Sequence, residues 1–311
     1  MILTEQSDHS HPRIAAIGTF DGVHLGHRHL IDELCRQGEL YGLVPTVVTF
    51  ANHPRRLVDP GFKLDMLMSV DERIAELTNA GIADVILFKF DNSTRGMSAR
   101  DFLRRLRRDF DVKVLLMGFN NRFGHDRIAD FDRYREIGRE EGVDVIRSDE
   151  FTSDEAPSVS SSIIRNALNG YHPETAATLL GHPYSITGTV EHGKELGRTI
   201  GFPTANLRPT NPDRLIPPDG VYVAEAVLPD TTRRRAILNI GHRPTVDSES
   251  APKSIEVHIL DYDGDLYGQK IQIEFLHFIR KEQRFESLDQ LRRQLESDAE
   301  KARRFNSTYR T

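Results

Sequence analysis

Two histidines and three glycines lie close together in residues 18–27, which read GTFDGVHLGH. This segment joins a predicted strand at 14–17 to a helix predicted to begin near Gly26. Glycine lets a backbone approach a phosphate closely, and the free N–H groups of a helix N-terminus attract anions. His24 and His27 lie one helical turn apart, so both imidazoles can face one bound polyphosphate. The spacing predicts a phosphate site, and the alternative is a tight turn with two surface histidines.

A second group of polar residues follows a loop in the C-terminal third of the chain. The Walker pattern is absent there, but the backbone can cradle a phosphate around Gly193, Gly197, Arg198 and Gly201. Thr204 and Asn206 then offer two oxygen donors that face the same way in an extended segment. Both can reach one Mg²⁺ beside ATP oxygens. A Pro-Thr turn with an Asn cap is the alternative.

A third candidate is the carboxylate of Glu256, in a segment with the alternation of a strand. Ile255 and Val257 share one face, which leaves Glu256 and His258 on the other. A carboxylate there can accept the proton of an attacking hydroxyl, as a phosphoryl transfer requires. The alternative is an exposed strand carboxylate, with Glu274 on the next strand as the rival base.

The elements that position these residues differ between the two parts of the chain. In the N-terminal part, apolar runs alternate with helical patterns, and the runs are 14–17, 46–50, 85–90, 113–117 and 143–146. This alternation predicts a Rossmann-like α/β domain with a parallel sheet. Ser69 and Ser98 each precede a carboxylate by three residues, as at capped helix starts. Ligands bind at the carboxyl ends of such strands, where residues 18–27 lie.

The C-terminal part is rich in strands after two short helices, predicted near 162–168 and 174–180. An acidic segment at 148–158 precedes them and is predicted to be a mobile loop. Gly181 and Pro183 end the helical pattern, which predicts domains at 1–182 and 183–311. A small antiparallel barrel is predicted from the runs 185–190, 221–228, 236–240, 254–262 and 270–279. A terminal helix is expected to pack on it through Leu288, Leu291 and Leu295.

Composition limits the class of protein. The chain has 311 residues, enough for two domains, and 38% of them are hydrophobic with no run of membrane length. The net charge of −6 argues against nucleic acid or an anionic membrane as the main partner. The polar first twelve residues predict no signal peptide and a cytoplasmic protein. The single cysteine, Cys35, fits a buried structural thiol better than a nucleophile.

Taken in order, these motifs resemble the bacterial bifunctional riboflavin kinase/FAD synthetase family. The resemblance includes Phe20-Asp21-Gly22 within the first segment, and it continues through 50–55, 97–99, 118–120, 122–124, 160–165 and about 188–303. It implies a C-terminal domain that phosphorylates riboflavin to FMN with ATP. It also implies an N-terminal domain that adenylylates FMN to FAD and releases pyrophosphate, with Mg²⁺ serving both reactions.

The resemblance also implies roles for individual residues. The ATP phosphates would be contacted by His24 and His27, within a loop that includes Gly18, Phe20, Asp21 and Gly22. Closure over the polyphosphate would involve Ser161, Ser162 and Arg165, although Arg165 can also be read as a surface arginine. Glu256 matches the general base of the kinase. Asn120 would contact the flavin or adenosine end, Asn239 would shape the kinase site, and residues 280–285 would cover the flavin.

Two positions depart from the family pattern. Asn121 stands where the family usually has an aromatic residue or histidine, and Ala129 stands near a common glycine. Lost ring stacking would weaken flavin affinity, so a riboflavin kinase with a weakened or lost adenylyltransferase is one alternative. A non-catalytic flavin-binding regulator is another. Incubation with riboflavin, ATP and Mg²⁺ separates the three, since FMN and FAD can be resolved. The sequence does not predict the oligomeric state.

Overall fold

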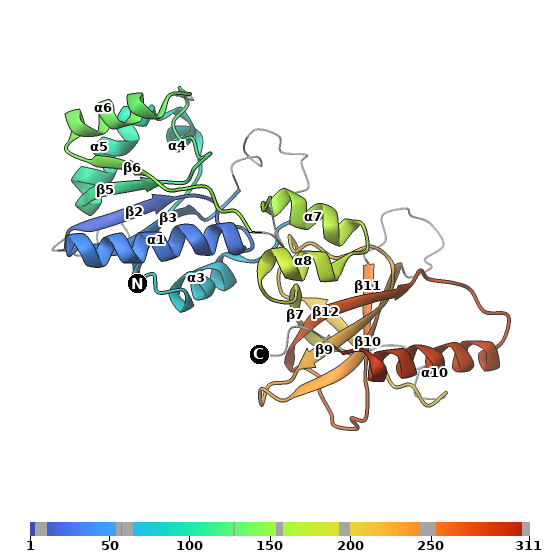
Figure 1. Cartoon of the computed structure of the whole chain (residues 1–311). Helices are drawn as coiled ribbons and strands as arrows, with labels where there is room; N and C mark the ends of the chain where they lie inside the picture. Colours follow the sequence, from blue (N-terminus) through green and yellow to red (C-terminus); the bar gives the residue numbers. More distant parts are fainter. Residues whose placement is uncertain are drawn as a thin grey trace. The chain divides into compact units, whose positions relative to one another are not determined.

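The computed structural model describes residues 1–3, 11–53, 57, 65–126, 128–153, 158–192, 200–242 and 253–306. The chain forms two compact units, residues 1–159 and residues 160–311 (Figure 1). Each unit has its own sheet. The predicted combination of an α/β domain with a small antiparallel barrel is confirmed.

The first unit is built on a six-stranded parallel sheet with the order β1-β4-β3-β2-β5-β6. Its strands are β1 (Ile2–Leu3), β2 (Arg13–Ile17), β3 (Val44–Phe50), β4 (Asp84–Phe88), β5 (Val112–Met117) and β6 (Asp144–Arg147). Its described helices are α1 (Leu25–Tyr41), α3 (Val70–Asn79), α4 (Asn92–Gly96), α5 (Ala99–Phe110) and α6 (Phe131–Glu141). The two-residue edge strand β1 is too short to give a sequence pattern, so it was not predicted.

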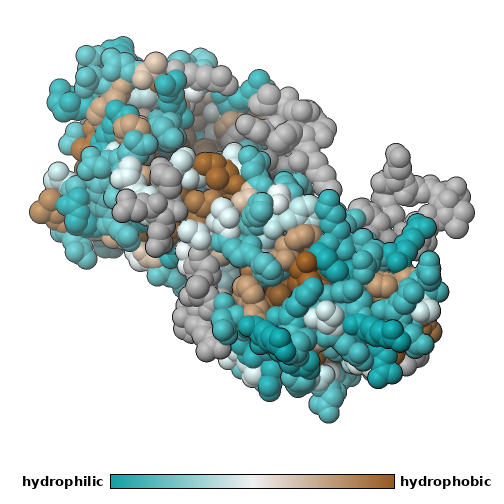
Figure 2. All heavy atoms as spheres, turned by 45° about the vertical axis from the view of Figure 1, so that its right-hand side comes forward, coloured by the Kyte–Doolittle hydropathy of each residue, from teal (hydrophilic) through white to brown (hydrophobic). Residues whose placement is uncertain are grey.

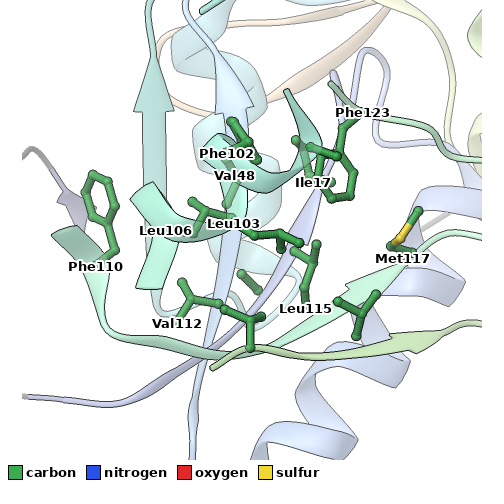
Figure 3. Packing of buried hydrophobic residues seen from close by; sticks show 14 of the residues in the cluster. Ile17, Val48, Phe102, Leu103, Leu106, Phe110, Val112, Leu115, Met117 and Phe123 are labelled. Atoms are coloured by element: carbon green, nitrogen blue, oxygen red, sulfur yellow. The ribbon is translucent and has the colours of Figure 1, made fainter. Parts of the chain in front are cut away.

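Helices cover both faces of this sheet because each central strand is apolar on both sides. Ile14 and Ala16 of β2 pack in the cluster with α1 and α3. Ala15 and Ile17 point the other way, into the cluster with α5 and α6. Figure 3 shows part of this second cluster, where Phe102, Leu103 and Leu106 of α5 pack beside residues of the sheet.

The predicted helix starts are confirmed by their caps. Ser69 accepts a hydrogen bond from the Glu72 amide, and the Glu72 carboxylate accepts one from the Ser69 amide, which completes a capping box. Ser98 accepts from the Asp101 amide in the same way. These caps fix where α3 and α5 begin, and α3 contributes to the site described below.

The second unit contains a closed six-stranded barrel with the order β10-β11-β8-β7-β12-β9. Its strands are β7 (Ser185–Glu191), β8 (Ala205–Pro209), β9 (Gly220–Val227), β10 (Arg233–His242), β11 (Lys253–Ile259) and β12 (Lys270–Arg280). All pairs are antiparallel, as predicted. The barrel prediction lacked β8, which is short, ends in proline and has little alternation.

Two short helices, α7 (Ser161–Asn169) and α8 (Pro173–Leu180), pack on each other, and α8 lies against β12. Gly181 ends α8 in the left-handed conformation, with φ of 80°, as its predicted capping role requires. Contacts therefore group residues 160–182 with the barrel. The functional boundary at 182/183 stays a prediction. The described part of segment 148–158 contains no helix or strand, and the rest lies outside the described residues.

The terminal helix α10 (Leu288–Arg304) begins at the cap of Ser287 and packs on the barrel as expected. The contact is made by its last turns, where Ala299 and Ala302 join the cluster of Val221 and Ile237. Leu288 is 60% exposed, so its predicted place on the packed face was wrong. Small alanines allow the close approach of the helix, and its first turn extends beyond this contact.

The surface in Figure 2 is predominantly hydrophilic, with hydrophobic residues in scattered groups. Among the described residues, the helices are all too short or too polar to cross a bilayer. Cys35 is half-buried and donates to the Gly81 carbonyl at 3.7 Å. Burial raises the pKa of its thiol, which disfavours the thiolate that a nucleophile needs.

Candidate active sites

The loop after β2 has an unusual backbone. Phe20 and Val23 adopt positive φ values of 50° and 37°, and Gly22 has φ of 89°. The left-handed region is unfavourable for a β-branched residue such as Val23, and such strain concentrates at functional sites. A hydrogen bond from the Val23 amide to the Phe20 carbonyl closes this turn at 3.2 Å. A Cβ on Gly18 would lie 3.0 Å from the Phe20 ring, a tight contact that the glycine avoids.

Two buried side chains hold this loop in place. The Asp21 carboxylate accepts hydrogen bonds from the amides of Leu67 and Met68 at 3.0 and 3.2 Å. Arg73 of α3 donates to the Thr19 carbonyl at 2.7 Å. Asp21 belongs to the predicted nucleotide loop; these bonds show that its carboxylate also holds the loop, and its contact with a nucleotide stays a prediction. Sequence reasoning missed Arg73, although it lies four residues before Leu77 on the apolar stripe of its helix.

The two histidines meet at the start of α1, as their spacing predicted. His24 is the N-cap, and its Nδ1 accepts from the His27 amide at 3.3 Å. The proton of a neutral His24 ring is therefore on Nε2, a donor suited to an anion. The two rings are stacked, with centroids 3.7 Å apart. Both imidazoles thus lie together at a helix N-terminus.

Burial lowers the pKa of His27 well below its usual value, and the nearby His24 and Arg73 lower it further. His27 is therefore neutral at pH 7. Its buried Nδ1 has no hydrogen-bond partner within the described part of the chain. An unsatisfied buried nitrogen is costly, so a ligand that supplies a partner would be favoured here.

A cavity of about 270 Å³ lies at the carboxyl ends of β5 and β6, and Asn120, Asn121 and Ala129 are among its lining residues. Asn120 is exposed, whereas the Asn121 amide donates to the Ile17 carbonyl and ties the turn to β2. The guanidinium of Arg147, which sequence reasoning missed, lies 4.6 Å from the centroid of the Phe119 ring. Asn121 thus stabilises the turn, and its effect on flavin affinity stays a prediction.

The serines and arginine predicted to close over the polyphosphate lie in the second unit. Ser160 caps α7 by accepting from the Ile163 amide at 3.3 Å. Ser161 and Ser162 form the first turn, and half-buried Arg165 follows on the same helix. Their approach to a nucleotide stays a prediction.

In the barrel, three predicted residues form one row across neighbouring strands. Glu256 of β11 lies opposite Asn206 of β8 and opposite Asn239 of β10. Residues directly opposite have Cβ atoms about 4.5–5.5 Å apart and point to the same face. Ile255 and Val257 are buried on the other face, as the alternation predicted. We call Asn206, Glu256 and Asn239 the polar row.

Glu256 and its rival Glu274 have different environments. Glu256 is half-buried, and its carboxylate has no hydrogen bond or ion pair among the described residues. Glu274 is buried and paired with Arg233. Burial raises the pKa of Glu274, and the charge of Arg233 opposes that shift. The geometry favours Glu256 as the base, because Glu274 is engaged and lies outside the polar row.

Thr204 lies directly before β8 and lines a cavity of about 250 Å³. The loop after β11 also lines this cavity, with Tyr262 and Tyr267. His258 donates from Nδ1 to the Pro203 carbonyl at 2.7 Å and so anchors the segment that carries Thr204. Burial lowers the pKa of His258, so the ring is neutral. This anchoring role of His258 was not predicted.

The segment after β12 reaches the polar row. Asn239 donates to the Glu282 carboxylate at 3.1 Å. The same carboxylate lies where a Cβ on Gly241 would be, so the glycine lets the Glu282 side chain approach the strand closely. Gly201 is exposed with φ of 84°. The remaining predicted loop residues, Gly193, Gly197 and Arg198, lie outside the described residues.

Comparison with known proteins decides the family. Residues 6–163 match the FAD synthetase family, and residues 180–306 match the riboflavin kinase family. The bifunctional riboflavin kinase/FMN adenylyltransferase of Escherichia coli (strain K12) is 37% identical over 94% of this chain and 92% of its own length. The chain belongs to this bifunctional family. The Bacillus subtilis (strain 168) enzyme of the same name is 32% identical, over 96% of this chain and 93% of its own.

The fold is shared with a solved structure described as a macrolide-efflux protein from Streptococcus pneumoniae. It is 28% identical, covers 98% of this chain and 99% of that chain, and has a TM-score of 0.88. Family membership shows that the protein is a riboflavin kinase and an FMN adenylyltransferase. It makes FMN from riboflavin and FAD from FMN, and both reactions use ATP. The comparisons support two activities rather than a kinase alone or a non-catalytic regulator.

Proposed function

We propose that the histidine pair of α1 serves adenylyl transfer and that the polar row serves riboflavin phosphorylation. The observation that carries the first assignment is the stacked pair of His24 and His27 at a helix N-terminus, directly after a strained loop. The observation that carries the second is the unpaired Glu256 between Asn206 and Asn239.

In adenylyl transfer, a phosphate oxygen of FMN attacks the α-phosphorus of ATP, and the bond to pyrophosphate breaks. The enzyme positions both substrates and stabilises charge on the departing group. Nε2 of His24 and the amides of the first turn of α1 are donors for those oxygens. His27 is neutral in the free protein, so it can take up a proton when polyphosphate binds beside it.

In the kinase reaction, the terminal ribityl hydroxyl of riboflavin attacks the γ-phosphorus of ATP, and ADP leaves. Glu256 accepts the hydroxyl proton as the new O–P bond forms. Asn206 and Asn239 flank the carboxylate and can donate hydrogen bonds to substrate oxygens. The cavity beside Thr204 suits the nucleotide, because its wall combines aromatic rings with backbone groups.

Mg²⁺ fits the donors near the polar row. The Thr204 hydroxyl and the Asn206 amide oxygen are hard ligands two residues apart, and Mg²⁺ usually keeps several waters and binds substrate phosphates. When bound, the ion would neutralise charge on the transferred phosphoryl group. Thr204 and Asn206 would hold it, and Glu256 remains available as the base.

The test uses the full chain and its Asn206→Ala variant, with Mg²⁺ varied. We expect the variant to need more Mg²⁺ for FMN formation from riboflavin, while FAD formation from supplied FMN keeps its wild-type dependence. Asn211→Ala, in the turn after β8, is the matched control. An unchanged Mg²⁺ requirement for FMN formation would remove Asn206 from the metal site.

A further inference from the structure

The first unit contains two buried arginines at opposite ends of its parallel sheet. Arg13 begins β2, is 1% exposed and donates to the Asp84 carboxylate at 3.1 Å. Arg73 lies at the carboxyl ends of the strands and is 3% exposed. It donates to the carbonyls of Thr19 at 2.7 Å and Phe50 at 2.6 Å. Among the described residues, no carboxylate lies within ion-pair distance of Arg73, but the charge of the nearby Asp21 carboxylate favours the guanidinium. The Nε of Arg73 has no hydrogen-bond partner in the same part of the chain.

This arrangement is expensive for a residue with only a structural role. A buried charge is costly unless it is fully compensated, and burial lowers the pKa of Arg73 although the charge of Asp21 opposes that shift. The two carbonyls held by Arg73 belong to separate segments. Thr19 directly precedes the strained turn at Phe20, and Phe50 ends the neighbouring strand β3. Arg73 therefore fixes the loop of the histidine pair relative to the sheet.

We propose that Arg73 is a positioning residue for adenylyl transfer. It holds the turn at 20–23 in its left-handed conformation, and that conformation delivers the chain to His24 at the start of α1. Without the hydrogen bonds from Arg73, Phe20 and Val23 can relax toward ordinary backbone angles, since the left-handed region is unfavourable for both. This inference rests on the proposed function of the histidine pair.

The experiment compares three variants of the full chain: Arg73→Met, Arg73→Lys and Arg13→Met. Arg13→Met is the matched control, because it removes an equally buried arginine from the opposite end of the same sheet. FAD formation from FMN and ATP gives kcat and both KM values, with assays well below each variant's melting temperature. Riboflavin phosphorylation in the same samples reports on the barrel.

We expect Arg73→Met to lower kcat for FAD formation by about ten- to a hundredfold, since a shift of about 1 Å can cost a hundredfold. The KM values should change less, and riboflavin phosphorylation should stay at the wild-type rate. Arg73→Lys retains the charge and one hydrogen bond, so it should recover part of kcat. Arg13→Met should lose stability but keep kcat in the folded protein.

A kcat for Arg73→Met within twofold of that for Arg13→Met would overturn the proposal. If Arg73→Met does not fold, the test uses Arg73→Lys instead. A kcat for FAD formation equal to that of the wild type in Arg73→Lys would then overturn the proposal. His27→Ala separates this inference from the function on which it rests. Loss of FAD formation in His27→Ala alone rejects only the role of Arg73, whereas full activity in both rejects the site itself.

Discussion

The two candidate sites hold their polar groups in opposite ways. The histidine pair lies where a strained loop enters a helix, and the loop is held by Asp21 and Arg73. The polar row lies within paired strands, where the backbone ladder fixes each side chain. A loop site therefore depends on anchors that are distant in sequence, whereas a strand site depends mainly on the residues that perform the chemistry.

The strongest test of this comparison is Glu256→Gln, which keeps the shape of the side chain but cannot accept a proton. Loss of a general base usually costs about 10²- to 10⁴-fold, so FMN formation should fall by that factor. Binding of riboflavin and ATP should weaken only modestly, and FAD formation from supplied FMN should persist. Glu274→Gln is the control. A larger loss of FMN formation in Glu274→Gln than in Glu256→Gln would make Glu274 the general base in place of Glu256.

A buried ion pair supports the segment that reaches the polar row. Asp298 of α10 is fully buried, and Arg280 at the end of β12 donates to it at 2.9 Å. Removing one partner of such a pair costs about 3–5 kcal/mol, so Asp298→Ala should lower the unfolding free energy of the barrel unit by that amount. Glu300→Ala breaks an exposed pair with Arg304 on the same helix and should cost below about 1 kcal/mol. Equal losses, measured by denaturant unfolding, would contradict this view of the barrel wall.

His27→Ala tests the loop site directly. Loss of one preorganised donor to transition-state charge costs about a hundredfold or more, so FAD formation from supplied FMN should fall accordingly. Riboflavin phosphorylation should stay close to wild type. His29→Ala, two residues along the same helix, controls for helix stability. Unchanged FAD output in His27→Ala would mean that the pair has only a structural role.

The smallest effect expected is a pH dependence of stability. The folded first unit resists protonation of His27, whereas the unfolded chain binds that proton near pH 6.5. The unfolded state therefore binds more protons than the folded state below pH 6.5. As the pH is lowered through this range, the unfolding free energy decreases by up to about 1.4 kcal/mol per pH unit. His258 gives the barrel a loss of the same sign. The test compares the unfolding free energy of the first unit at pH 7.5 and pH 5.5. His27→Gln should show a smaller decrease than wild type, and an equal decrease in both proteins would contradict the prediction.

The sequence predicted the arrangement of side chains on the strand better than that in the loop, for a physical reason. Alternation of Ile255, Glu256 and Val257 determines which side chain faces out of the barrel, so the sequence pattern itself carries the geometry. No periodicity reports that Asp21 turns inward to the amides of Leu67 and Met68. The same limit applies to Leu288, because helical spacing identifies a face but not where along its length the helix touches the barrel.

The polar row has a consequence for the order of folding events. Its members come from positions 206, 239 and 256, so the row exists only after strands distant along the chain have paired. Such pairings close large loops and are slow to form. After refolding from denaturant, FMN formation should therefore begin only when the barrel has closed. The time at which FMN formation begins after dilution from denaturant then measures the time of barrel closure. This measurement uses catalytic activity and needs no spectroscopic signal.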